Sequence, residues 1–500
     1  MQYRSTRNKG IAVSSSEAIK KGLSNEGGLF VPETFPRVSE DDIKGLKDLS
    51  YRERAYFVLS KFLTDFTDEE LSYCIDNAYT KQKFETDTIA PLYKLNDKEY
   101  ILELWHGPTC AFKDMALQIL PYLLTTSMKK TNEDKKIVIL VATSGDTGKA
   151  ALEGFKDVED TKIMVFYPDN GVSEIQKLQM ITQDGDNVGV AAVKGNFDDA
   201  QSGVKKIFTD EEYKKLLADN GYKLSSANSI NWGRLVPQIV YYFSAYTDML
   251  KSGEIDMGEK VNVVVPTGNF GNILASYYAY KMGLPINKFI CASNENNVLT
   301  DFIKTGVYNK NREFHTTISP SMDILISSNL ERFLYDVSGE NDNLVSDLMQ
   351  KLNSEGIYEV DSSIKEKLLD LFYAGCADDK ETMETIKNCD EEYGYVVDTH
   401  TAVACAVYKK YVAETGDKTK TVIASTASPF KFNQSVLIAL DGHNSVVSKG
   451  EFELLEILSE KSGMEIPRSL HELKTKPVVF DIVCEKNEMQ QTVNEFLNVN

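Results

Sequence analysis

Lys113 stands where an apolar stretch meets the expected start of a helix. In HGPTCAFKDMALQ, residues 106–118, it follows Cys-Ala-Phe and precedes Asp114. Burial lowers the pKa of a lysine because it disfavours the charged form, and the neutral amine is a nucleophile. Most lysines at such a position are exposed to solvent. Lys113 is therefore a candidate for a Schiff base with a carbonyl cofactor only if other residues complete such a site.

A second stretch, KIVILVATSGDTGKAA (136–151), indicates a strand that enters a helix through a glycine-containing turn. Backbone N–H groups and the positive end of the helix dipole meet at such a turn and favour an anion. A plain turn in which Asp146 or Thr147 caps the helix is the alternative. The candidate anion-binding residues here are Thr143, Ser144, Gly145, Asp146 and Thr147.

The stretch VNVVVPTGNFGNILASYYAY (261–280) has the same arrangement of strand, glycine-containing turn and helix. It matches neither GxGxxG nor GxxxxGK[ST], which disfavours nucleotide binding but leaves open a cofactor phosphate held by backbone groups. A turn without a ligand is the alternative. The candidate residues are Gly268, Asn269, Phe270, Gly271 and Asn272.

Two other stretches place polar side chains at the ends of expected elements. In SSANSINWGRLVPQ (225–238), Ser229, Asn231 and Arg234 stand at the start of a long helix, and a guanidinium can bind two oxygens of one phosphate. In TVIASTASPFKF (421–432), Thr426 follows a strand, and the carboxyl ends of strands are where α/β sheets receive ligands. The alternatives are a solvated arginine and a simple turn.

Composition excludes several classes of protein. The net charge of −20 disfavours nucleic acid and anionic membrane as partners, and no apolar run is long enough to span a bilayer. Seven scattered cysteines without a CxxC pair argue against both a disulfide framework and a zinc site. No HExxH or GxSxG motif is present, so no metal site or serine triad is predicted. Without an apolar secretory leader, we expect a cytoplasmic protein.

Strand-like runs alternate with helical ones from about residue 96 onward, and this alternation predicts parallel sheets in an α/β fold. We expect a mostly helical region over 1–95, a smaller α/β domain over 96–200 and a larger α/β domain over 201–500. The acidic helical pattern near 340–395 suggests a helical insertion. The expected strands are EYILELW, KIVILVA, KIMVFYP, NVGVAAV, VNVVVP, FICAS and TVIAST.

Taken in order, six motifs resemble those of threonine synthase of the bacterial and fungal type. The resemblance extends from about residue 3 to residue 435, and YRSTR and SNEGGLFVPE near the amino terminus share it. No motif is recognised after 435. The motifs are HGPTCAFKDMALQ, ATSGDTGKAA, NSINWGRLVPQ, PTGNFGN, SPSMDILISSNLERF and STASPFKF.

The resemblance implies a fold-type II pyridoxal 5'-phosphate enzyme of the tryptophan synthase β family, with Lys113 as its Schiff-base lysine. It implies that residues 268–272 hold the cofactor phosphate and that Thr426 bonds the pyridine nitrogen. Asp146 would lie near the cofactor where many relatives carry asparagine. Thr143, Ser144 and Gly145 would receive the substrate carboxylate. The substrate phosphate would be bound by Thr147, Ser229, Asn231 and Arg234.

The implied reaction converts O-phosphohomoserine and water into threonine and phosphate, with γ-elimination followed by β-addition, in a monomer or homodimer. Another fold-type II lyase, such as a serine or threonine dehydratase, shares the lysine and the cofactor loop but needs no second phosphate site. A relative that binds a phosphorylated ligand without catalysis is the remaining alternative. The stretch NSINWGR favours the first interpretation over the dehydratase.

Overall fold

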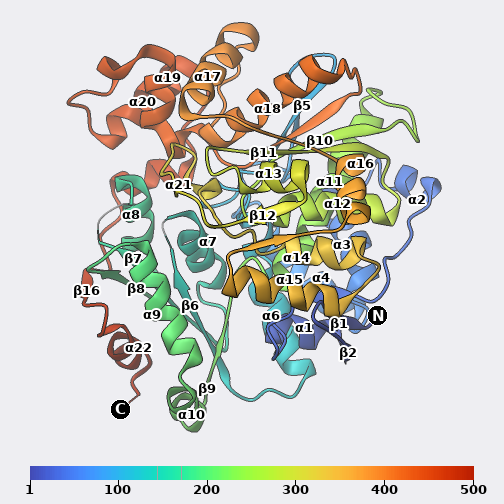
Figure 1. Cartoon of the computed structure of the whole chain (residues 1–500). Coiled ribbons are helices and arrows are strands. Elements are labelled where there is room, and N and C mark those ends of the chain that lie inside the picture. The colour runs from blue at the N-terminus through green and yellow to red at the C-terminus, as the bar shows by residue number, and fades with distance from the viewer. Residues whose placement is uncertain (144, 170–171, 500) are drawn as a thin grey trace.

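The computed structural model describes residues 1–143, 145–169 and 172–499, and two β-sheets organise it (Figure 1). The larger sheet is parallel except for β4 at its edge, which runs antiparallel to β5. In spatial order its strands are β14 (Phe372–Cys376), β11 (Ile286–Ser293), β10 (Val261–Pro266), β15 (Thr421–Ser425), β5 (Glu99–Glu103) and β4 (Leu92–Lys94).

The smaller sheet has five strands, all parallel. Its last strand in sequence comes from near the carboxyl terminus and lies beside β8 (Figure 1). In spatial order its strands are β16 (Ile482–Cys484), β8 (Val188–Val193), β7 (Thr161–Pro168), β6 (Lys136–Ala142) and β9 (Tyr222–Ser225). The prediction of an α/β fold with two parallel sheets is confirmed.

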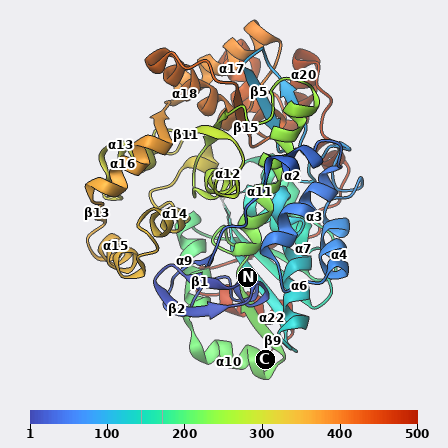
Figure 2. The same cartoon turned by 90° about the vertical axis from the view of Figure 1, so that its right-hand side faces the viewer.

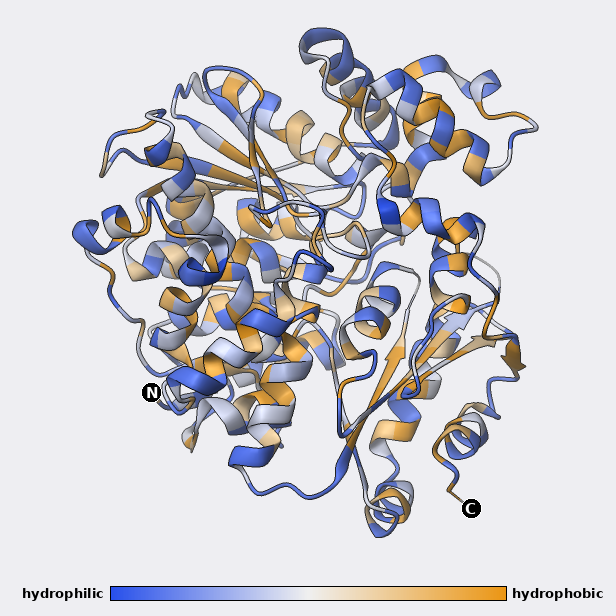
Figure 3. Cartoon of the chain, turned by 180° about the vertical axis from the view of Figure 1, so that it is seen from behind, coloured by the Kyte–Doolittle hydropathy of each residue, from blue (hydrophilic) through white to orange (hydrophobic). Residues whose placement is uncertain are grey.

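The central strands of both sheets are covered on both faces, which explains why they are continuous apolar runs rather than alternating ones. In β10, Val263 and Val265 pack into one core, while Val264 between them packs into a second. In β6, Ile139 packs into the same core as Val263, while its neighbour Leu140 packs into a third core on the other face of the smaller sheet. The strands of the smaller sheet stand out as hydrophobic ribbons in Figure 3. All seven strands expected from the sequence are present.

The first 80 residues contain four helices and a small antiparallel sheet of β1 (Tyr3–Ser5), β2 (Asn8–Val13) and β3 (Phe30–Pro32). Each helix begins with a capping box, in which the first side chain and one three residues later satisfy each other's backbone N–H groups. Figure 2 shows α3 and α4 near α6 (Leu120–Lys130). The helices are α1 (Ser15–Lys21), α2 (Glu40–Gly45), α3 (Tyr51–Phe62) and α4 (Asp68–Ala78).

The middle of the chain supplies the helices that pack between and around the sheets. Pro121 lies in the first turn of α6, where its missing N–H costs nothing. Pro237 lies inside α11, yet the helix continues, because nearly all of its side chains are buried. These helices are α5 (Asp114–Leu117), α7 (Asp146–Phe155), α8 (Glu174–Ile181), α9 (Phe197–Thr209), α10 (Glu211–Asp219), α11 (Trp232–Lys251) and α12 (Gly271–Met282).

The last part of the chain returns to both sheets. Helix α18 packs against the larger sheet, α22 against β8, and α19 against α17 and α20. The short strands β12 (Val307–Asn309) and β13 (Ile357–Glu359) pair with each other. The helices here are α13 (Val298–Thr305), α14 (Leu330–Val337), α15 (Asp342–Ser354), α16 (Ser362–Leu371), α17 (Asp379–Tyr393), α18 (Thr399–Thr415), α19 (Asn433–Asp441), α20 (Glu451–Ser462), α21 (Arg468–His471) and α22 (Met489–Leu497), with 3-10 turns η1 (Pro320–Met322), η2 (Pro429–Phe432), η3 (His443–Ser445) and η4 (Glu472–Lys474).

The sheets do not follow the expected boundaries. Strands β4 and β5, which fall near or within 96–200, lie in the larger sheet, whereas β9 and β16, from the 201–500 range, lie in the smaller one. The segment 340–395 is mostly helical as expected, but its strand β14 forms the edge of the larger sheet. Sheet membership depends on pairing between distant strands, and that pairing leaves no local signal in the sequence. In the described part of the chain, no helix is long and apolar enough to cross a membrane.

Candidate active site

The segment before α5 is fixed to the end of β15 by backbone contacts. Ala111 forms an isolated antiparallel bridge with Ala427. The N–H of Phe112 donates to the carbonyl of Thr426 (2.8 Å), and the N–H of Ser428 donates to the carbonyl of Cys110 (3.0 Å). Residue 113 is therefore placed at the carboxyl end of the larger sheet, where α/β proteins receive ligands.

The amine of Lys113 lies among groups from two other parts of the chain. Its Nζ donates to Ser321 Oγ (3.1 Å) and to Asp146 Oδ2 (3.3 Å). The side chain is 12% exposed. Burial lowers the pKa of Lys113, the carboxylate of Asp146 opposes this, and the positive charges of Lys431 and Arg234 add to the lowering. The amine of Lys113 is thus largely shielded from solvent, and its role as a Schiff-base lysine stays a prediction.

Asp146, the first residue of α7, is bound by cationic and neutral donors together. Lys431 Nζ lies 2.5 Å from its Oδ1, and Gln176 Nε2 donates to the same oxygen (3.0 Å). Ser321 Oγ donates to Oδ2 (3.3 Å). Burial would raise the pKa of this carboxyl, but the charges of Lys431 and Lys113 outweigh it and hold the pKa well below its ordinary value. Asp146 is therefore ionised at neutral pH.

A buried histidine supports the backbone of Ser321. His400 Nε2 accepts a hydrogen bond from the N–H of Ser321 (3.1 Å), and its Nδ1 lies 2.9 Å from Asp398 Oδ1. An accepting Nε2 leaves the proton on Nδ1, so this arrangement fits a neutral imidazole that donates to Asp398. The dyad at the start of α18 thus fixes the position of Ser321 beside Lys113.

The turn between β6 and α7 is closed by its own groups. Thr143 Oγ1 accepts from the N–H groups of Gly145 and Gly148, at 3.0 Å each. Gly145 has φ 151°, and a Cβ at this position would lie 2.5 Å from the amide of Gln176. Thr147 follows Asp146 in the first turn of α7. Ser144, also predicted here, lies outside the described residues.

The loop 268–272, which the sequence predicts to be an anion cradle, is held through its carbonyl groups. Its carbonyls turn toward residues 327–329: Ser327 Oγ donates to the carbonyl of Gly268 (2.7 Å), and the N–H of Asn329 donates to that of Asn269 (3.1 Å). Within the described chain, no acceptor takes a hydrogen bond from the backbone N–H groups of 268–272. A Cβ at Gly268 would lie 2.7 Å from the carbonyl of Ser321.

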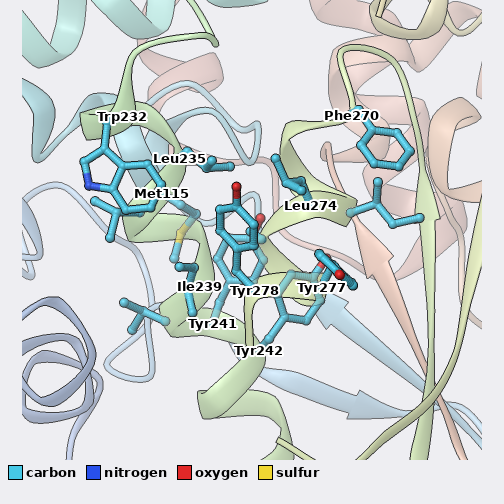
Figure 4. Close-up of a cluster of buried hydrophobic side chains, with 14 of the residues drawn as sticks. Met115, Trp232, Leu235, Ile239, Tyr241, Tyr242, Phe270, Leu274, Tyr277 and Tyr278 are labelled. Carbon is cyan, nitrogen blue, oxygen red and sulfur yellow. The ribbon is translucent and has the colours of Figure 1, made fainter. Parts of the chain in front are cut away.

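The side chains around this loop fix its conformation. Phe270 has φ 60° and packs against Phe333 and Phe372. Oδ1 of Asn272 accepts from the hydroxyls of Tyr241 (2.7 Å) and Tyr242 (2.5 Å). Asn272 Nδ2 is buried and has no partner in the described chain, so it is an unused donor beside the cradle. Figure 4 shows Tyr241, Tyr242 and Phe270 among the buried hydrophobic side chains of this region.

The three residues predicted to hold a second phosphate differ in their surroundings. Asn231 caps α11, accepting from the N–H of Gly233 (2.8 Å) and donating to the carbonyl of Ile19 (2.9 Å). Ser229 is half-buried, and its carbonyl accepts from Asn329 Nδ2 (3.2 Å). That amide also donates to Asn269, so the two predicted phosphate regions are neighbours.

Arg234 is a buried guanidinium. Its Nη1 donates to the carbonyl of Ala227 (2.6 Å), while its Nε has no partner among the described residues. Within the same part of the chain, no carboxylate lies within ion-pair distance of it. Burial lowers the pKa of Arg234 to about 10. A buried cation without a counter-ion is costly, so this position favours binding of an anion.

Four residues of the site were absent from the sequence-based prediction. Ser321 and Lys431 lie inside motifs that carried the resemblance, but neither was assigned a role. His400 belongs to no HExxH motif, and Gln176 lies in an ordinary helix. Motif membership was the available signal for the first two. For the other two, only the folded arrangement brings them to Asp146 and Ser321.

Comparison with known proteins matches three family models along the chain. "Threonine synthase N terminus" matches residues 2–79, "Pyridoxal-phosphate dependent enzyme" residues 86–427, and "Threonine synthase, C-terminal" residues 401–494. Threonine synthase of Pseudomonas aeruginosa is 39% identical over 87% of this chain and 90% of its own length. The chain belongs to the threonine synthase family.

Solved structures of threonine synthases share the whole fold. The pyridoxal phosphate-bound enzyme of Brucella melitensis is 34% identical, covers 99% of this chain and 98% of its own, and gives a TM-score of 0.88. The yeast enzyme is 35% identical, with 99% coverage of both chains and the same TM-score. Human "Threonine synthase-like 1" is 43% identical over 85% of this chain. That protein is longer, and this chain spans only 58% of its length. The fold-type II architecture is thereby established.

Proposed function

We propose that this protein is a threonine synthase, a pyridoxal phosphate-dependent lyase that converts O-phosphohomoserine and water into threonine and phosphate. The family, the buried amine of Lys113 and the unpaired N–H groups of 268–272 support this function. When bound, pyridoxal phosphate supplies an electron sink for a carbanion next to the substrate nitrogen. The residues present fit the cofactor, since Lys113 offers a nucleophile and the cradle offers donors for a phosphate.

The roles of the protein's own residues follow from their positions. Lys113 would remove and return protons at the substrate carbons, because its amine is buried and its pKa is lowered. Residues 268–272 would hold the cofactor phosphate, and Thr426, at the end of β15, would face its ring. The turn at Thr143 and Gly145 would receive the substrate carboxylate. Asp146 would orient Lys113 and the cofactor through the contacts described above.

The environment of Arg234 favours a phosphorylated substrate over the unphosphorylated substrate of a dehydratase. Its charge is buried, and no carboxylate among the described residues pairs with it. The cofactor phosphate has its own cradle at 268–272. A substrate phosphate, bound through Arg234 with Ser229 and Thr147, would supply the missing negative charge. Asn231 would act by holding the start of α11.

Replacing Arg234 by methionine tests the substrate. We expect kcat/KM for O-phosphohomoserine to fall about 30-fold to several thousandfold, corresponding to ~2–5 kcal/mol for a lost charged pair to phosphate. Any turnover of serine or threonine should barely change. Without ligands, the variant should be at least as stable as wild type, because an uncompensated buried charge is removed. Equal loss of both activities together with cofactor would reject the substrate assignment.

Replacing Lys113 by alanine tests the cofactor assignment. The variant should fold normally, yet lose both the visible absorbance of a covalently attached cofactor and all threonine formation. Asp114→Asn at the next position is a matched control for local disturbance and should keep the absorbance band. A fully active Lys113→Ala protein would exclude the proposed function. Cofactor capture by the wild-type protein without turnover of any amino acid would favour the non-catalytic alternative.

The proposed setting is the cytoplasm, with the protein as a monomer or homodimer. All seven cysteines are free thiols, and six of them are buried. Free thiols are typical of a reducing compartment. Fractionation of cells together with light scattering of the purified protein would test both statements.

A further inference from the structure

Lys431 is a second buried lysine beside Lys113, and its side chain has no exposed surface. It lies on η2, shortly after β15 ends at Ser425, and it belongs to the motif STASPFKF. Its Nζ contacts Asp146 Oδ1 (2.5 Å) and donates to the carbonyl of Thr109 (2.9 Å). Thr109 lies in the segment that bears Lys113, and Asp146 contacts the Lys113 amine directly.

The carboxylate of Asp146 is shared between two lysines that both follow strands of the larger sheet. Lys431 contacts its Oδ1, and Lys113 contacts its Oδ2. We propose that Lys431 is a positioning residue, which holds Asp146 and takes up part of its negative charge, so that Asp146 stabilises the protonated form of the Lys113 amine less strongly. This inference concerns Lys113 as the proposed cofactor-binding amine, and so rests on the proposed function.

The charges in the cluster predict that removing Lys431 raises the pKa of Lys113. Without Lys431, Asp146 would pair with Lys113 alone, and the ammonium form of Lys113 would be stabilised. The repulsion that Lys431 exerts on a charged Lys113 would also disappear. Both changes favour the unreactive, protonated amine. The other groups that face this cluster are Asp114 on α5, Arg234 on α11, Asp398 next to α18 and His400 on α18.

The contact also joins the two sheets. Asp146 begins the helix that follows β6 in the smaller sheet, whereas Lys431 follows β15 in the larger one. The fully buried Lys431 side chain and its bond to Thr109 leave its ammonium little freedom to move. Lys431 therefore fixes where Asp146 meets Lys113.

Reductive methylation of the cofactor-free protein (residues 1–500) with formaldehyde and cyanoborohydride as the hydride donor tests the proposal. The methylation of Lys113 is followed by mass spectrometry as a function of pH, with the more exposed Lys461 as internal standard. In Lys431→Met, we expect the pH at which methylation of Lys113 is half-maximal to rise by about one unit. Below that pH, this is a roughly tenfold loss of neutral amine. Lys431→Arg keeps the charge and should stay close to wild type.

An unchanged midpoint in a folded Lys431→Met protein would overturn the proposal. If that variant does not fold, Lys431→Gln takes its place, because the amide keeps a donor for the Asp146 carboxylate and removes the charge. The pH midpoint for methylation of Lys113 should also rise in Lys431→Gln, and an unchanged midpoint would overturn the proposal. Because the readout needs neither substrate nor cofactor, its result is separate from whether threonine is formed.

Discussion

Lys113 and Asp114 are consecutive residues, and burial favours the neutral form of both. It lowers the pKa of Lys113 and raises the pKa of Asp114 to about 6. Asp114 accepts from the N–H and the hydroxyl of Thr109, at 2.8 Å each, which limits the increase. One residue thus serves the proposed chemistry, while the next holds the loop that leads to it.

The raised pKa of Asp114 predicts a pH dependence of stability. The folded state keeps a proton that the unfolded state releases, so the free energy of unfolding should fall as pH rises from about 4 to about 6. The contribution is about 3 kcal/mol for a shift of roughly two pKa units. In Asp114→Asn this decline should be absent. Urea unfolding at several pH values measures it, and parallel curves for the two proteins would contradict the assignment.

At the scale of elements, α7 and α5 pack closely enough to require glycine. A Cβ at Gly154 of α7 would overlap the backbone carbonyl of Leu117 in α5. These two helices begin next to the residues that meet in the site, Asp146 and Lys113. Their separation therefore sets the distance between the carboxylate and the amine.

Gly154→Ala should destabilise the protein, although alanine favours a helix. The overlap should cost ~1–3 kcal/mol and lower threonine formation by moving α7 away from α5. The matched control is Gly45→Ala in α2, where a Cβ meets no atom within 4 Å. That change should be neutral or stabilising by up to ~1 kcal/mol. Thermal unfolding and activity of both variants decide this, and equal behaviour would refute the packing argument.

At the scale of the whole molecule, the carboxyl-terminal segment completes the smaller sheet. Strand β16 pairs with β8, and Met489, Val493 and Leu497 of α22 share a core with β6 and β7. Figure 1 shows this segment beside the sheet, far along the chain from the strands it joins. The sheet that leads to Asp146 therefore depends on residues near the end of the described chain.

Ending the chain after residue 479 should destabilise the smaller sheet first. The truncation would expose the edge of β8 and part of the core that α22 shares with β6 and β7. Exposed strand edges promote aggregation. Hydrogen exchange should increase in β7 and β8 while β10 and β11 stay protected. Cofactor binding to the larger sheet should weaken less than turnover. Uniform protection in both sheets would show that β16 and α22 contribute little.

The sequence by itself determined the alternation of strands and helices, because buried parallel strands need apolar runs and crossover helices have their own period. It also singled out Lys113, Arg234 and the loop at 268–272, since local motifs bring their residue types together. Only the tertiary structure decided which strands share a sheet and that Lys431, Ser321 and His400 meet at the site. The physical reason is that these contacts join residues far apart in the chain, and their energies depend on burial and distance that no local pattern records.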